Sequence, residues 1–402
     1  MRHGRDPGGE GDAAPLPFFD FDAPVDRSGT WAMRWEKYGP DVIPLWVADT
    51  DFRVPPAVRE AIRARLEHGV LGYTSPPEAL RQILVERMAR LYGWRIEPDW
   101  IVFIPGVVPG LHLAARHLAR AQEHVLVPTP IYHHFKRAVE LAPRPHADVP
   151  LVLSRGRWVF DEEALAAAVR PDSRLLYLCN PQNPGGTIFG REELERLAAL
   201  ALRRGLLLCS DEIHADLLLD PGKPHVPVAS LAPEVSRRTV TLVSPNKAFG
   251  FPGAGCAFAI IEDAALRRAF AADHHATVHD ASVFGYEAAL AAYRECDAWL
   301  AAQLDYLRGN RDLVEREVAR MPGLALAHVE ATYLAWIDCS GLGVADPCRH
   351  FLQGGVALSP GSQFGDARFV RLNFGTQRGR LAEALARMAR AVSSASRPSP
   401  TG

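Results

Sequence analysis

Short apolar runs that alternate with turns and helical stretches between about residues 85 and 262 constrain the fold of this chain most strongly. One stretch, 191–204, has the composition of a helix. Continuous apolar runs separated by helices are typical of a mostly parallel sheet that helices cover on both faces. The sequence therefore predicts an α/β fold, with strands at 125–127, 175–179, 206–209, 240–243 and 257–261.

Polar side chains follow two of these runs at their carboxyl ends, where ligands bind in such sheets. Lys247 follows the run 240–243 within Ser-Pro-Asn-Lys and is one of only four lysines in the chain. A buried lysine can lose its proton and form imines, so Lys247 is either a Schiff-base lysine or a solvated lysine in a turn. Asp211, in Ser-Asp-Glu-Ile-His, is suited to pair with the pyridinium nitrogen of pyridoxal phosphate or to cap a helix.

Two further segments carry groups that suit an amino-acid ligand. The turn Asn-Pro-Gln-Asn-Pro-Gly-Gly at 180–186 either offers an asparagine to the phenolic oxygen of the cofactor or is a plain turn. Arg371 lies inside the apolar stretch 369–374. A buried guanidinium requires an anion, which is either a substrate α-carboxylate or an internal acidic side chain.

With these motifs the chain resembles the pyridoxal-phosphate-dependent aminotransferase superfamily (class I/II) of fold type I. Within it, the chain resembles the branch of cystathionine β-lyases and cysteine-S-conjugate β-lyases. The resemblance covers residues 18 to about 392. It implies a large domain with a mostly parallel sheet of the seven-stranded type and a smaller α+β domain. The specific motifs are Trp-Val-Ala-Asp-Thr-Asp-Phe at 46–52, His-Gly-Val-Leu-Gly-Tyr at 68–73, Pro-Gly-Val-Val-Pro-Gly at 105–110, the turn at 180–186, Ser-Asp-Glu-Ile-His at 210–214, Ser-Pro-Asn-Lys at 244–247 and Arg-Leu-Asn at 371–373.

The resemblance implies a role for each matching residue. The expected catalytic residues are Lys247, which would bind the cofactor covalently, Asp211, which would pair with its pyridinium nitrogen, and Tyr132, which would stack on its ring. The other expected contacts with pyridoxal 5'-phosphate are Asn183, His214, Gly106, Val107, Val108, Ser244 and Tyr73. The amino-acid substrate would be held by Arg371, Asn183 and Asp49. Tyr73 would reach the phosphate in the neighbouring subunit, which implies a homodimer with shared sites.

Four positions depart from the usual pattern of this family. Gly185 stands where Thr or Ser is usual, and Asn246 stands where Ser more often precedes the lysine. Gly250 and Gly255 follow the lysine in place of larger residues, and we expect them to open space or add mobility beside the phosphate. These departures bear on the identity of the substrate rather than on the reaction type.

The length of 402 residues indicates more than one hydrophobic core. We expect an N-terminal segment at 18–49 that joins the small domain, a large domain at 50–290 that binds the cofactor, and a small C-terminal domain at 291–392. The Ala-rich stretch 281–320 is expected to be helical. Residues 1–17 are predicted to be a disordered tail and 393–402 a frayed one.

Composition and charge exclude several classes of function. The net charge of −2 argues against a nucleic-acid partner, and the chain has neither a membrane-spanning run nor a secretory signal, so we expect a cytoplasmic protein. Six cysteines without CxxC spacing are expected to be reduced and buried. The histidines show no metal-binding spacing, so no metal is expected, and the glycine-rich segments do not match a nicotinamide fingerprint.

The function implied by the resemblance is cleavage of a carbon–sulfur bond. An L-cysteine conjugate such as cystathionine would yield a thiol, pyruvate and ammonia. An aminotransferase would use the same residues and begin with identical steps, so it stays open as the alternative. A regulatory protein on this scaffold is a third reading, which the intact set of Lys247, Asp211, Asn183 and Arg371 disfavours.

Overall fold

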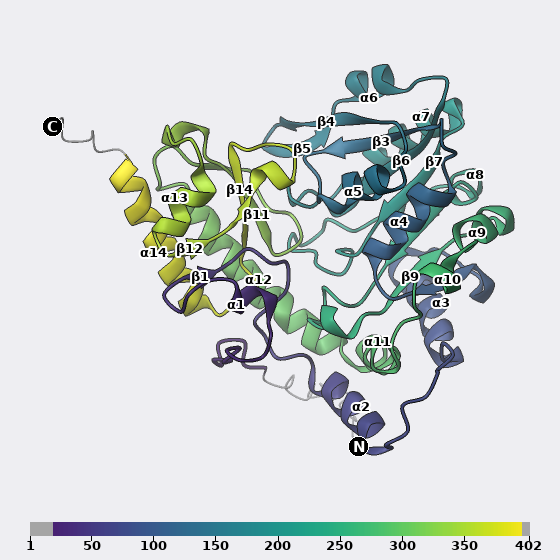
Figure 1. Ribbon diagram of the computed structural model, residues 1–402, viewed down its shortest axis with the longest axis horizontal. Helices are drawn as coiled ribbons and strands as arrows, with labels where there is room; N and C mark the ends of the chain where they lie inside the picture. Colours follow the sequence, from purple (N-terminus) through teal and green to yellow (C-terminus); the bar gives the residue numbers. More distant parts are fainter. Residues whose placement is uncertain (1–18, 396–402) are drawn as a thin grey trace, which may run out of the picture.

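The computed structural model describes residues 19–395, which form two sheet-centred parts joined by a long helix (Figure 1). The predicted tail at 1–17 lies outside the described residues, as do residues 396–402. The predicted C-terminal tail begins too early, because residues 393–395 belong to helix α14 (Arg378–Ala395).

An eight-stranded sheet forms the larger part. Its central strands are parallel, while β9 and β5 run antiparallel to their neighbours. The α/β prediction is confirmed, and each of the five runs predicted as strands lies in this sheet. There are eight strands rather than seven because a hairpin adds β5 at one edge. In spatial order the strands are β2 (Ile101–Ile104), β9 (Ala257–Ile260), β8 (Thr239–Val243), β7 (Leu207–Asp211), β6 (Ser173–Cys179), β3 (His124–Thr129), β4 (His146–Ser154) and β5 (Arg157–Phe160).

Helices cover both faces of this sheet, as its continuous apolar strands require. Alternate residues of β6 show the division, because Tyr177 packs with α4 and α5 whereas Leu176 and Leu178 pack with α6 and α7. The helix predicted at 191–204 is confirmed as α7. The helices of these two layers are α4 (Val107–His117), α5 (His134–Leu141) and α9 (Ala264–Phe270) on one face, and α6 (Glu162–Ala168), α7 (Arg191–Arg204) and α8 (Pro233–Ser236) on the other.

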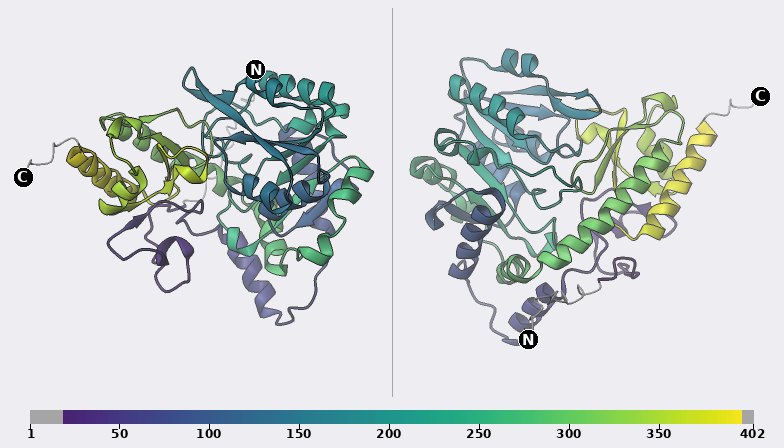
Figure 2. Two further views of the ribbon diagram at one scale, coloured as in Figure 1. Left: turned by 45° about the horizontal axis from the view of Figure 1, so that its top comes forward. Right: turned by 180° about the vertical axis from the view of Figure 1, so that it is seen from behind.

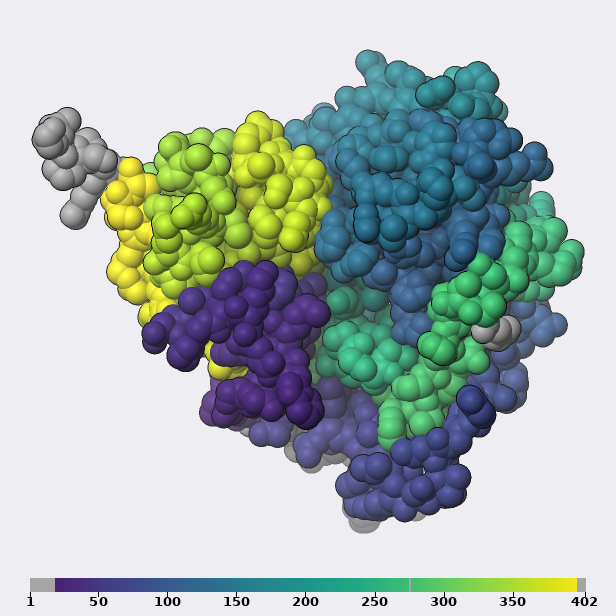
Figure 3. Space-filling view, viewed as in Figure 1, coloured from purple at the N-terminus to yellow at the C-terminus, as the bar shows by residue number. Residues whose placement is uncertain are grey.

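The smaller part contains a four-stranded antiparallel sheet and a two-stranded parallel one. The order in the four-stranded sheet is β10 (Ala325–Leu326), β11 (Leu334–Asp338), β14 (Phe369–Asn373) and β13 (Ser359–Pro360). In the two-stranded sheet β1 (Ile43–Pro44) pairs with β12 (Val356–Ala357). The N-terminal residues, purple in Figure 3, therefore lie against the yellow C-terminal part (Figures 2 and 3). The domain boundaries stay a prediction.

Helices on the remaining faces connect the two parts. The stretch 281–320, predicted as helical, contains α11 (Val283–Glu295) and α12 (Asp297–Val318), which are separated at Cys296. Helix α12 runs from the large sheet to the small one, where it packs against α14 (Figure 2). The other helices are α1 (Met33–Glu36), α2 (Pro56–Glu67), α3 (Glu78–Tyr92), α10 (His274–Thr277) and α13 (Pro347–Gln353).

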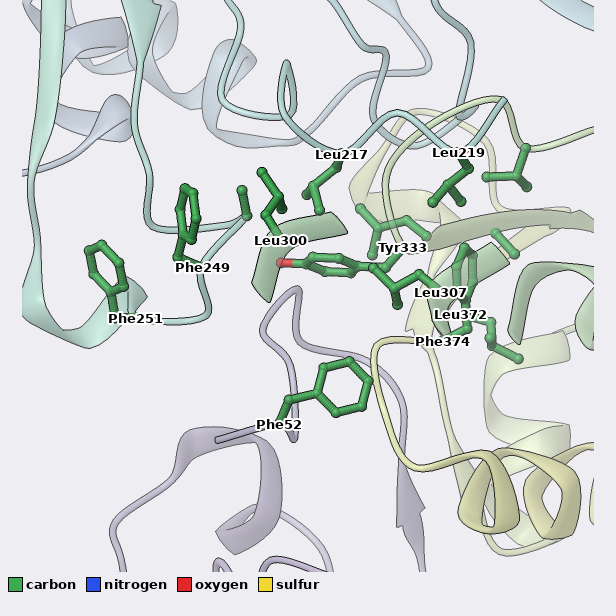
Figure 4. Close-up of a cluster of buried hydrophobic side chains, with 14 of the residues drawn as sticks. Phe52, Leu217, Leu219, Phe249, Phe251, Leu300, Leu307, Tyr333, Leu372 and Phe374 are labelled. Atoms are coloured by element: carbon green, nitrogen blue, oxygen red, sulfur yellow. The ribbon is translucent and has the colours of Figure 1, made fainter. Parts of the chain in front are cut away.

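One hydrophobic core is continuous between the two parts. Figure 4 shows Tyr333 at its centre, with Phe249 from the loop after β8 on one side and Phe374 from the end of β14 on the other. Phe52 from the N-terminal segment belongs to the same core and lies below Tyr333 in this view. Within residues 19–395, no helix is long and apolar enough to cross a membrane. The six cysteines are free thiols, five of them buried and Cys348 half-buried.

Candidate active site

The carboxyl ends of β6, β7 and β8 meet at one edge of the large sheet and bring three predicted residues together. The N–H of Asn180, after β6, donates to the carbonyl of Asp211 at 3.0 Å, and that of Glu212 donates to Leu242 in β8 at 2.8 Å. Lys247 stands four residues beyond the end of β8. Parallel strands thus place the asparagine turn, the carboxylate and the lysine side by side.

Lys247 reaches across this edge to the N-terminal segment. Its Nζ donates to the carbonyl oxygen of Ala48 at 2.6 Å. Burial lowers the pKa of Lys247 to about 8, with a contribution from Arg371, although the carboxylates of Asp49 and Asp211 act in the opposite direction. The side chain is half-buried and bonded to the backbone, which disfavours the solvated turn lysine, and the lowered pKa favours a partly neutral amine near pH 8.

Asp211 is a buried carboxylate without a cation in contact. It ends β7, is 5% exposed and accepts the N–H of Ile213 at 3.0 Å. Burial raises the pKa of Asp211 to about 7, against the lowering effects of that N–H and of Lys247. No Lys, Arg or His of the described chain forms an ion pair with it. A cationic group bound here would stabilise the ionised carboxylate.

Arg371 is a buried guanidinium without a carboxylate in contact. From the middle of β14, Nη1 donates to Oδ1 of Asn183 at 3.0 Å and Nη2 to the carbonyl of Trp46 at 3.1 Å. Its Nε has no hydrogen-bond partner, and its Cζ atom lies 4.6 Å from the ring centre of Phe364. Burial lowers the pKa of Arg371 to about 10. Within residues 19–395 no carboxylate forms an ion pair with Arg371, which leaves this guanidinium suited to a ligand carboxylate.

Two ring-bearing side chains lie close to these charges. Burial, together with the charges of Lys247 and Arg371, lowers the pKa of His214 to about 3, so His214 is neutral, and its Nδ1 is buried without a partner. Tyr132 is half-buried, and burial raises the pKa of its hydroxyl, with opposing contributions from Arg371 and Asp211. Both side chains therefore lie near the charged residues of the site, and their predicted contacts with a cofactor stay predictions.

The N-terminus of α4 supplies the predicted backbone donors. Gly106 is the residue before the helix, and Val107 and Val108 form its first turn, whose N–H groups have no partner within the helix. The predicted hydroxyl of Ser244 is differently placed. Its Oγ donates to the carbonyl of Cys256 at 2.7 Å, so it must leave that acceptor before it can bind a phosphate.

One predicted residue lies near Lys247 but is already paired with cations, and another lies outside this group. Asp49 forms ion pairs with Arg27 at 3.0 Å and Arg34 at 3.3 Å, so its carboxylate already has two cationic partners. Tyr73 lies between α2 and α3 and is fully exposed, at 113% of its reference area. The predicted contact of Tyr73 with a cofactor therefore requires a second subunit.

Two residues of the site were not assigned a role from the sequence. Tyr333 is fully buried, and its hydroxyl donates to the carbonyl of Ala48 at 3.2 Å, the same oxygen that accepts from Lys247. Asn373 is fully buried at the end of β14 and bonds the backbone on both sides of Ala48. Asn373 could have been found as a polar residue inside an apolar strand. The sequence around Tyr333 contains no comparable signal.

The glycines that depart from the family pattern have local causes. Gly250 and Gly255 have φ values of +76° and +60°, a region that favours glycine, so the backbone rather than open space explains them. A Cβ on Gly185 would lie 2.7 Å from Oε1 of Gln182 and 2.8 Å from Cδ1 of Trp158. Glycine is therefore required there by crowding, not by conformational freedom. Asn246 is buried, and its Oδ1 has no hydrogen-bond partner.

The chain is similar in sequence to a known family and to characterised relatives. A family model described as aminotransferase class I and II matches residues 40–388. The chain is 34% identical to cystathionine beta-lyase PatB of Bacillus subtilis, over 93% of this chain and 100% of that protein. It is 32% identical to protein MalY of Escherichia coli, over 93% and 99%.

Solved structures are also similar to this chain over most of its length. The structure described as OvoB has a TM-score of 0.92 and 46% identity, covering 94% of this chain and 100% of that one. Cystalysin from Treponema denticola, which contains pyridoxal 5'-phosphate, has a TM-score of 0.90 and 28% identity, with coverage of 94% and 100%. The chain therefore belongs to the pyridoxal-phosphate-dependent class I and II aminotransferase family, in the branch that includes the cystathionine β-lyases.

Proposed function

We propose that this protein is a carbon–sulfur β-lyase that uses pyridoxal 5'-phosphate (PLP) to cleave L-cystathionine or another L-cysteine S-conjugate. One arrangement carries the proposal. A lysine with a lowered pKa, Lys247, lies between a buried carboxylate without a cation, Asp211, and a buried guanidinium without an anion, Arg371. The relatives named cystathionine β-lyase support the reaction type.

The residues present fit this cofactor. Asp211 would pair with the pyridinium nitrogen, which would supply the cation that this carboxylate lacks. Lys247 would hold the aldehyde carbon, and the first N–H groups of α4 would bind the phosphate. Tyr132 would stack on the ring, while His214 and Asn183 would lie beside it. When bound, PLP withdraws electrons from Cα of an attached amino acid.

The side chains of this chain then perform two tasks. Arg371 binds the substrate α-carboxylate through its free Nε and a terminal nitrogen, and so fixes Cα beside Lys247. The neutral amine of Lys247 accepts the proton from Cα. The Cβ–S bond breaks with its electron pair going to sulfur, the thiolate takes a proton, and water converts the remaining enamine to pyruvate and ammonia.

The exposed Tyr73 supports a homodimer in which each subunit completes the site of the other. An aromatic side chain this exposed lies near Val70 and Leu71, which are also exposed, and such a surface favours a partner. We further propose that the protein is cytoplasmic. We also propose that the large domain spans residues 50–290.

The test is pyruvate release from L-cystathionine by the cofactor-loaded protein without any added 2-oxo acid. Sustained release of pyruvate and thiol supports a β-lyase. Amino transfer that requires a 2-oxo acid, with no pyruvate in its absence, would instead identify an aminotransferase. Lys247→Ala should abolish both turnover and the visible absorbance of the covalently bound cofactor. Lys136→Ala, which removes an exposed lysine, should retain both.

A further inference from the structure

Four consecutive backbone carbonyls cross the candidate site, and their hydrogen bonds alternate between two sides. These belong to residues 46–49, here called the strap. On one side, Nδ2 of Asn373 donates to the carbonyls of Val47 and, at 2.6 Å, of Asp49. On the other side, the carbonyls of Trp46 and Ala48 accept from Arg371 at 3.1 Å and Lys247 at 2.6 Å. Successive carbonyls of the strap therefore face opposite partners, although the backbone bends at Val47 and Ala48.

Asn373 forms hydrogen bonds through both its side chain and its backbone, with the strap and with the residues beside it. Its backbone N–H donates to the carbonyl of Leu45 at 2.9 Å, and its Oδ1 accepts the N–H of Gly375 at 2.7 Å, which fixes the orientation of the amide. The side chain is fully buried. This amide holds the carbonyls on both sides of residue 48 and so helps to set the direction of the Ala48 carbonyl, together with Arg34, whose Nη1 also donates to the Asp49 carbonyl at 3.0 Å.

We propose that Asn373 is a positioning residue that holds the strap so that the Ala48 carbonyl receives the amine of Lys247 whenever this amine is not linked to the cofactor. Tyr333 donates to the same oxygen at 3.2 Å and limits where the amine can lie. The inference rests on the proposed function, because only covalent chemistry at Lys247 requires its amine to be released and recaptured.

The chemistry of the acceptor explains why a carbonyl suits this position. A released lysine must stay within reach of Cα and must also become neutral to accept a proton there. A carboxylate would hold it as an ammonium ion, whereas a carbonyl accepts an N–H from either form. Because the carbonyls of Trp46 and Ala48 accept from Arg371 and Lys247, the strap also relates the positions of these two side chains.

The test measures the pKa of Lys247 in the full-length chain freed of cofactor. Trace acetylation with acetic anhydride over a range of pH, quantified by mass spectrometry, gives the titration of Lys247, with Lys37 and Lys136 as internal references. Asn373→Ala should lower the pKa of Lys247 by about one unit, because the ammonium form loses a fixed acceptor. An unchanged pKa would overturn the proposal.

Asn310→Ala is the matched control. Asn310 is also fully buried, and its Nδ2 also donates to two carbonyls, those of Phe374 at 3.0 Å and Thr376 at 2.8 Å, neither of which belongs to the strap. It should lower the melting temperature comparably and leave the pKa of Lys247 unchanged. An equal shift in both variants would show a general loss of packing and would overturn the proposal.

A second variant covers the case in which Asn373→Ala does not fold. Asn373→Ser retains a hydroxyl that can donate to only one of the two carbonyls, so it should shift the pKa of Lys247 in the same direction by less. No shift in a folded Asn373→Ser protein would again overturn the proposal. Because this measurement needs no substrate, its outcome is independent of whether the loaded protein releases pyruvate.

Discussion

The guanidinium of Arg371 donates from Nη1 to Oδ1 of Asn183 at 3.0 Å, which joins the small sheet to the turn after β6. The two residues are 188 positions apart in the sequence. The hydrogen bond orients the amide so that its Nδ2 is directed away from Arg371, as a donor to the cofactor's ring oxygen requires. One contact therefore relates the expected carboxylate site to the expected cofactor site.

Replacement of Arg371 by lysine should weaken substrate binding. Lysine keeps the charge but lacks the planar pair of donors that matches a carboxylate, so KM for L-cystathionine should rise about tenfold or more. Steady-state kinetics measures this change. Arg368→Lys, at an exposed ion pair with Asp366 just before β14, should leave KM within about twofold. Equal effects of the two variants would remove Arg371 from the substrate site.

Asp211 should make the stability of the cofactor-free protein depend on pH. Folding raises the pKa of Asp211 from 3.8 to about 7, so its contribution to stability is complete below the lower value and is lost as pH rises toward 7. Melting temperatures at pH 5 and pH 7.5 should therefore differ less in Asp211→Asn than in the wild type. Asp148→Asn, at an exposed carboxylate, should behave like the wild type. Bound cofactor should reduce the wild-type difference, because a pyridinium nitrogen stabilises the ionised carboxylate.

A side chain at Gly185 should destabilise the fold. Gly185→Ser would force its Cβ against Gln182 and the indole of Trp158, and such overpacking costs about 1–3 kcal/mol. Urea denaturation measures the free energy of unfolding. Gly39→Ser, where a Cβ meets nothing within 4 Å, serves as the control and should change stability by less than about 0.5 kcal/mol. A neutral Gly185→Ser would show that Trp158 moves aside without cost.

Mixing two inactive variants should restore activity if subunits share their sites. A Tyr73→Ala chain keeps Lys247, and a Lys247→Ala chain keeps Tyr73, so a mixed dimer contains one complete site. Random pairing should then return about a quarter of the wild-type activity. Sedimentation of the wild type should show a dimer. Persistent inactivity after subunit exchange, verified with differently tagged chains, would place Tyr73 outside the partner's site.

Much of the fold followed from the pattern of apolar residues. Runs such as 175–179 and 240–243 are almost entirely apolar, because both faces of their strands are buried. Strand β4 was missed because His146–Ser154 carries polar residues and its outer half is partly exposed. Helix α7 was predicted to the residue because Gly205 ends it in the left-handed conformation and acidic residues begin it.

The site was predictable only where a residue type is unusual for its surroundings. Arg371 carries a charge into an apolar segment, and Lys247 is one of only four lysines and follows a buried run, so both were identified from the sequence. Whether Arg371 has an internal partner depends on residues from distant segments, so only the three-dimensional arrangement excluded an ion pair. In the sequence Tyr333 resembles any tyrosine of a hydrophobic core. Its place in the site depends on a hydrogen bond to a carbonyl 285 residues away, which the sequence does not reveal.

The strap has a consequence for how the chain matures during synthesis. Asn373 and Val47 are 326 residues apart, and Ile43 in β1 pairs with Val356. As the chain leaves the ribosome, residues 43–49 can meet Arg27 and Arg34 early, but they lack β12 and Asn373 until almost the entire polypeptide has emerged, although the large sheet can already assemble. We therefore expect the strap to be ordered late, and a truncated translation product that lacks β14 would contain the Ala48 carbonyl without the Asn373 amide that holds the strap.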